Sequence, residues 1–140
     1  MRRHCSAGLL ALAALAAAAC GDLKEVFSLQ RGLAHEFNTQ AISVNMNTYN
    51  GNTTITVLFQ NSPVAQAPDS EQAALARRVG EYVRDHYSRY AQLQSIDVGF
   101  SSVKGGGFVR MTQTRVPFRF TPRDLGEPVT VTKAIPGDKH

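Results

Sequence analysis

The sequence predicts an α+β domain in which two helices cover one face of a four-stranded, mainly antiparallel sheet. Apolar residues recur at helical spacing in two segments, and each segment precedes a pair of shorter runs in which apolar and polar residues alternate. Each helix and the sheet must bury one apolar face. The expected architecture is therefore a two-layer α-β-β-α-β-β sandwich.

Composition excludes several classes of protein. Hydrophobic residues make up 43% of the 140 residues and charged residues 19%, which supports a packed core and argues against disorder. No long apolar run follows the leader, which excludes a membrane protein with several spans. The chain has 15 Lys and Arg against 11 Asp and Glu, but Arg2 and Arg3 lie in the leader. The remaining positive charge is a weak signal for an anionic partner.

Residues 1–19 have the layout of a secretory signal peptide. Arg2 and Arg3 precede an apolar run from Leu9 to Ala19 that ends in small side chains. A retained transmembrane anchor is the weaker alternative, because spanning a bilayer takes about 20 apolar residues. The sequence therefore predicts export.

The run Ala17-Ala18-Ala19-Cys20, followed by Gly21, resembles the lipobox of a bacterial lipoprotein precursor. The resemblance covers the leader alone. It implies cleavage before Cys20, acylation of Cys20, a short tether over residues 20–21 and a membrane as partner. In such proteins an Asp after the cysteine implies inner-membrane retention in some bacteria, so Gly21 favours the outer membrane.

An ordinary secretory cut after Ala19 is the alternative, and it would release a soluble protein. Cys5 would leave with the leader, so Cys20 would then be an unpaired thiol in an oxidising compartment. This argument favours acylation of Cys20.

A first helix is expected over Leu23 to Phe37, opened by a capping box of Asp22 and Glu25. Its expected core face consists of Leu23, Val26, Phe27, Leu29, Leu33, Ala34 and Phe37. A helix that lies on the membrane is the alternative. Its polar residues, however, mix acids with bases instead of forming a basic cluster.

The next segment predicts a hairpin with a defined register. A type I′ turn at Asn50-Gly51 would place Tyr49 opposite Asn52. The apolar pairs would then be Met46 with Ile55, Val44 with Val57 and Ile42 with Phe59. The opposite face would carry Asn45 with Thr56 and Asn47 with Thr54, which predicts a polar sheet face open to water or to a partner.

A second helix is expected to open at Asp69 with Gln72. Its expected core stripe consists of Leu75, Ala76, Val79, Tyr82, Val83, His86, Tyr87 and Tyr90. The opposite side carries Arg77, Arg78, Arg84 and Arg89 together with Glu81 and Asp85, which is typical of a solvated surface, with an anionic partner as the alternative. His86 is expected in the core, bonded to a tyrosine or a backbone group.

A second hairpin is expected from Ile96, with a break at Lys104-Gly105-Gly106-Gly107 and a last strand from Phe108 to Phe120. The change of apolar parity along that strand predicts a bulge or bend near Pro117. The single domain is expected to span residues 22–121. Residues 122–140 form a Pro-containing tail in which 129–132 is a candidate edge strand.

The best candidate for partner binding is a basic edge formed by Lys104, Arg110, Arg115, Arg119 and Arg123. Export argues against nucleic acid and favours an anionic envelope polymer, a lipid headgroup or an acidic protein face. Arginines that discourage aggregation at an edge strand are the alternative. The sequence predicts no catalytic set, no cofactor and no metal site. The hypothesis of an enzymatic function would depend on His86 alone.

The leading hypothesis is an exported, lipid-anchored, non-catalytic envelope protein that acts as an interaction or scaffold module. The alternative is a soluble or anchored binder of a small ligand or an anionic envelope polymer. It would use either the Arg110 to Arg123 edge or the polar sheet face.

Overall fold

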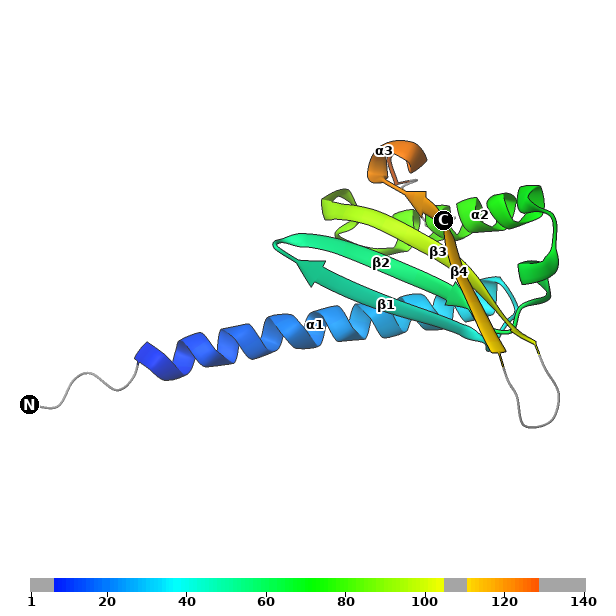
Figure 1. Ribbon diagram of the computed structural model, residues 1–140. Coiled ribbons are helices and arrows are strands. Elements are labelled where there is room, and N and C mark those ends of the chain that lie inside the picture. The colour runs from blue at the N-terminus through cyan, green and yellow to red at the C-terminus, as the bar shows by residue number, and fades with distance from the viewer. Residues whose placement is uncertain (1–6, 105–110, 129–140) are drawn as a thin grey trace, which may run out of the picture.

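The computed structural model describes residues 7–104 and 111–128, with side chains from 21 to 102 and at 114, 116 and 118–128. Figure 1 shows a four-stranded sheet with two long helices packed on the same face. The elements are α1 (Ala7–Glu36), β1 (Ile42–Tyr49), β2 (Asn52–Phe59), α2 (Asp69–His86), β3 (Leu93–Lys104) and β4 (Met111–Phe120), with short helices η1 (Pro63–Gln66), η2 (Tyr90–Gln92) and α3 (Pro122–Leu125).

The α+β fold class is confirmed. The strands lie in the order β1-β2-β3-β4, with β1–β2 and β3–β4 antiparallel. The central pair β2–β3 is parallel, because the chain crosses back through α2 before it enters β3. The sheet is thus mostly antiparallel with one parallel pair.

The first hairpin has the predicted register. Tyr49 pairs with Asn52, and the three apolar pairs align as expected down to Ile42 with Phe59. Asn50 and Gly51 have φ values of 50° and 79°, as a type I′ turn requires. Local turn chemistry and strand alternation were sufficient to define this unit.

The core lies between the sheet and the two helices. Leu29 and Leu33 of α1 and Ala76, Val79 and Val83 of α2 are buried against one face of the sheet. The other members of this buried face are Ile42, Val44, Ile55, Val57, Phe59, Ile96, Val98 and Phe100. Neighbouring rings of Phe37, Phe59, Phe100 and Phe118 form a row across the sheet, with centroid distances of 5.8, 5.5 and 6.2 Å.

The predicted start of the first helix is wrong. α1 runs from Ala7 through Cys20 to Glu36, so Asp22 is an internal helical residue and caps nothing. Alanine has the highest helix propensity, and the Ala-rich run before Cys20 continues the helix backward. Asp22 and Glu25 instead bind the rest of the domain: Asp22 pairs with Arg89, and Glu25 Oε1 accepts the Ser88 N–H at 2.7 Å.

The predicted core face of that helix is wrong at two positions. Leu23 and Phe27 are each 60% exposed, whereas Leu29 and Leu33 are buried. Phe27 and Leu29 are two residues apart, which separates them by about 160° around a helix, so both cannot face the sheet. The core uses the stripe through Val26, Leu29 and Leu33.

The second helix also begins differently from the prediction. Pro68 is its N-cap and Asp69 its first helical residue, so no capping box forms there. Gln72 instead donates from Nε2 to the carbonyl oxygens of Ala65 and Ala67, at 3.4 and 2.9 Å. Asp69 still favours the helix as an anion in the first turn.

The C-terminal part of the domain extends past the expected boundary. The bulge near Pro117 is confirmed. Val98 of β3 pairs with Phe118 of β4, but Phe100 pairs with Arg115, so β4 has one more residue than β3 between these two pairs. Pro122–Leu125, expected to be part of a tail, forms α3, and Leu125 is buried. Arg110 and the candidate edge strand at 129–132 lie outside the described residues.

Candidate functional site

A polar row crosses the face of the sheet that points away from the long helices. It consists of one residue from each strand, paired in register: Asn45, Thr56, Asp97 and Arg119. A second row, Asn47, Thr54 and Ser95, lies beside it, and Thr54 Oγ1 is 3.2 Å from Ser95 Oγ. No helix of the described residues covers this face (Figure 1). The predicted polar sheet face is therefore present.

The strongest interaction of the polar row joins Asp97 and Arg119. Arg119 donates from Nε to Asp97 Oδ1 at 2.9 Å and from Nη2 to Oδ2 at 2.7 Å. The Asp97 side chain is only 10% exposed, whereas that of Arg119 is 71% exposed. Hydrogen bonds from Arg119 hold the pKa of the Asp97 carboxyl below its usual value, against the opposing effect of burial.

Of the basic edge inferred from sequence, the structure describes the side chains of Arg119 and Arg123, and these two differ in their surroundings. Arg119 donates both of its hydrogen bonds described above to Asp97, whereas Arg123 is an exposed residue of α3. Lys104 ends β3, and Arg115 pairs with Phe100 in β4. Part of the positive charge of this segment is thus neutralised by an acid that the sequence places on a neighbouring strand.

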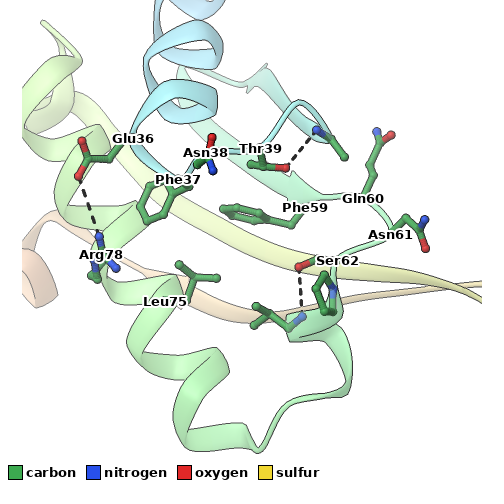
Figure 2. Close-up of a pocket in the computed structure, with 13 residues that line it drawn as sticks. Glu36, Phe37, Asn38, Thr39, Phe59, Gln60, Asn61, Ser62, Leu75 and Arg78 are labelled. Atoms are coloured by element: carbon green, nitrogen blue, oxygen red, sulfur yellow. Dashed lines mark hydrogen bonds and ion pairs between the residues drawn. The ribbon is translucent and has the colours of Figure 1, made fainter.

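A cavity of about 500 Å³ lies where α1, the end of β2 and α2 meet. Figure 2 shows Phe37, Phe59 and Leu75 facing its interior, while the amides of Gln60 and Asn61 point away. At one end Arg78 lies over the Phe37 ring, 5.2 Å from its centroid, and 4.0 Å from Glu36 Oε1. The cavity therefore combines an apolar floor with an exposed pair of opposite charges, Arg78 and Glu36, at its mouth.

Helix termination shapes one wall of this cavity. Asn38 has φ 47°, the Thr39 N–H donates to Ala34 O at 2.9 Å, and the Asn38 N–H donates to His35 O at 3.3 Å. These are the two bonds of a Schellman motif, with asparagine at the left-handed position. The motif ends α1 at Glu36 and turns the chain directly into β1.

His86 is not a core residue, and that prediction is wrong. It is exposed at the end of α2, where its ring stacks on Tyr82 with centroids 3.9 Å apart. Nδ1 lies 2.8 Å from the Tyr82 carbonyl oxygen, so Nδ1 carries the proton of this hydrogen bond. The expected bond to a backbone group is present, although the side chain lies at the surface.

Cys20 lies within α1, two residues before Asp22. Within residues 7–104 and 111–128, no helix is both long and apolar enough to span a membrane. The same part of the chain contains no group of three or more His, Cys, Asp or Glu side chains able to hold a metal ion.

Two features of the site were not predicted from sequence. Asp97 was not singled out, although it alternates with Ile96 and Val98 and so had to share the face of Thr56. The alternation of side chains along the strand was therefore enough to predict that Asp97 belongs to the polar row. The cavity had no comparable signal, since Phe37, Phe59 and Leu75 come from three elements whose packing is non-local.

Comparison of the chain with protein-family models, curated proteins and solved structures finds no match.

Proposed function

We propose that this chain is an exported, lipid-anchored protein of the bacterial cell envelope that acts as a non-catalytic interaction or scaffold module. The observation that carries the proposal is the leader, with Arg2 and Arg3, the apolar run to Ala19, and Cys20 directly after small residues. Gly21 after the cysteine favours the outer membrane where the cell has one.

The contacts at the start of the folded domain set how far it would lie from the anchor. After cleavage before Cys20, only Gly21 would separate the acylated residue from Asp22, which binds Arg89. Two residues span at most about 7 Å. The anchor would therefore hold the domain against the bilayer, and its partners would be membrane-proximal.

Incorporation of labelled palmitate tests the anchor. We expect wild-type protein to be labelled and to have a mature mass of residues 20–140 plus acyl groups, while Cys20→Ala loses the label. Cys5→Ala is the matched control and keeps both properties, because residue 5 leaves with the leader. An unlabelled product beginning at Cys20 would mean ordinary secretion and would refute the anchor.

The polar row is the surface we propose for the partner. Asn45 and Arg119 expose hydrogen-bonding groups on this sheet face, and the charge of Arg119 is already neutralised by Asp97, which favours a protein surface over a polyanion. A photo-cross-linking residue at Asn45, exposed on β1, should capture a partner in cells. A photo-cross-linking residue at Ala73, which is exposed on α2, is the control. Equal capture at positions 45 and 73 would contradict the assignment of the polar row as the partner surface.

Binding of an anionic envelope polymer through the basic edge is the alternative. Arg115→Glu with Arg123→Glu tests it while leaving the Asp97–Arg119 pair intact. Unchanged retention of the protein on purified cell-wall polymer would eliminate this alternative.

The cavity favours a second candidate function, the binding of a small molecule with an apolar body. Its floor is apolar, and the Arg78–Glu36 pair lies at its mouth. The fluorescent anion anilinonaphthalene sulfonate is a suitable probe. Leu75→Phe should weaken its binding by filling the cavity, whereas Leu58→Phe, on the other face of the sheet, should not.

A further inference from the structure

α1 presents an apolar surface that the domain does not cover. Leu23 and Phe27 are each 60% exposed, although large apolar side chains usually pack inside. They lie four residues apart on one helix, so they are neighbours on its surface. Lys24, Phe27, Gln30 and Arg31 surround a shallow hollow beside them.

Position 20 belongs to the same helical stripe. Residues 23, 24, 27 and 31 follow it by three, four, seven and eleven positions, and these spacings return to one face of an α-helix. Leu29, which is buried against the domain, lies on the opposite side. The face that would carry the acylated cysteine is thus the face turned away from the core.

The structure separates the charges of α1 by sign. Each of its three acidic residues has a partner on the rest of the domain: Asp22 binds Arg89, Glu25 accepts the Ser88 N–H, and Glu36 lies 4.0 Å from Arg78. The outward stripe carries the exposed cations Lys24 and Arg31. In the sequence, these acids were the argument against a helix that lies on the membrane. In the structure they face the rest of the domain and not the outward stripe.

We propose that the outward face of α1, formed by Leu23, Lys24, Phe27 and Arg31, is a membrane-contact surface. It lies on the leaflet that holds acylated Cys20, with Leu23 and Phe27 inserted at the headgroup level and the two cations beside anionic phospholipid headgroups. α1 then lies between the bilayer and the sheet. This inference rests on the proposed acylation of Cys20.

Fluorescence in vesicles tests the contact with the acylated mature protein. Its own cysteine is blocked by acylation, so a cysteine introduced by Leu23→Cys or Phe27→Cys is the only thiol to label with an environment-sensitive dye. Val116→Cys is the matched control, since Val116 is an exposed apolar residue of β4 (48%). The vesicles contain phosphatidylethanolamine and phosphatidylglycerol at a ratio of three to one, with a headgroup-level spin-labelled lipid as quencher.

We expect the dye at positions 23 and 27 to be quenched at least about threefold more than at 116 and to emit at shorter wavelength. Quenching at 23 and 27 that equals quenching at 116 overturns the proposal. Adding Lys24→Glu and Arg31→Glu should reduce quenching at 27 in these vesicles but not in pure phosphatidylcholine. An equal effect in both lipids would overturn the role of anionic headgroups.

The two proposals fail in distinguishable ways. The mass of each reconstituted sample reports whether acyl groups are present on Cys20. Absence of acyl groups refutes the anchor itself, whereas an acylated sample without quenching at 23 and 27 refutes only the membrane contact. A protein docked on this face in cells would also leave the dye unquenched in pure lipid vesicles.

Discussion

The hydroxyl of Tyr82 in α2 lies against Gly32 in α1, in the space that a Cβ at position 32 would occupy. Burial raises the pKa of the Tyr82 phenol, with the Glu36 carboxylate adding to the effect. The Tyr82 hydroxyl therefore occupies this position only because residue 32 has no Cβ, even though glycine lowers helix propensity.

Gly32→Ala should destabilise the protein by about 1–3 kcal/mol, because the new methyl group displaces Tyr82. Gly21→Ala, also in α1 but with nothing within 4 Å of its added Cβ, should change stability little, because residue 21 becomes the second residue of the mature chain after the proposed cleavage. Urea unfolding of the purified variants measures both. Tyr82→Phe should recover part of the loss in the Gly32→Ala background, and strictly additive effects would contradict the contact.

Arg119→Ala should lower the free energy of unfolding at pH 7, because the nearly buried Asp97 carboxylate loses two donors. The pKa of Asp97 is depressed in the folded protein, so this stabilisation is complete above the unfolded value of about 3.9. It is lost as the pH falls through the folded pKa.

Urea unfolding of wild type and Arg119→Ala between pH 7 and pH 2 checks this pH dependence. The difference between the two proteins should shrink below about pH 4. Arg123→Ala is the control for removal of an arginine from the same segment. A difference that stays constant down to pH 2 would show that the Asp97 carboxylate is not its cause.

Gly51→Ala should cost about 1 kcal/mol, since Gly51 has φ 79° and a side chain is strained there. The cost is a backbone effect, because nothing lies within 4 Å of the added Cβ. Asn50→Gly should be tolerated, since glycine also adopts positive φ. Thermal unfolding distinguishes the two, and equal losses would argue against a type I′ turn.

Tyr90→Phe should destabilise the protein by about 0.5–1.5 kcal/mol, because the buried Tyr90 hydroxyl donates to Pro122 O at 3.0 Å and holds α3. Tyr49→Phe is the matched control, since Tyr49 is 76% exposed and should change stability little. Denaturant unfolding compares them. Comparable losses would mean that the contact with α3 contributes nothing specific.

The sequence by itself determined the parts of the fold that depend on neighbouring residues. Asn50-Gly51 defines the turn, and the alternation on either side of it fixes the register from Tyr49 to Phe59. The change of parity around Pro117 likewise predicted the bulge in β4. These features are local, because backbone preference and strand periodicity act within a few residues.

Only the tertiary structure decided which helix residues face the core and which acids have partners. Val26, Phe27 and Leu29 are all apolar, and the docking angle of α1 on the sheet selects Leu29 and leaves Phe27 outside. Asp22 had the sequence position of a helix cap but binds Arg89, 67 positions away. Contacts between distant segments form when elements pack, so neither helical spacing nor capping preference alone could identify them.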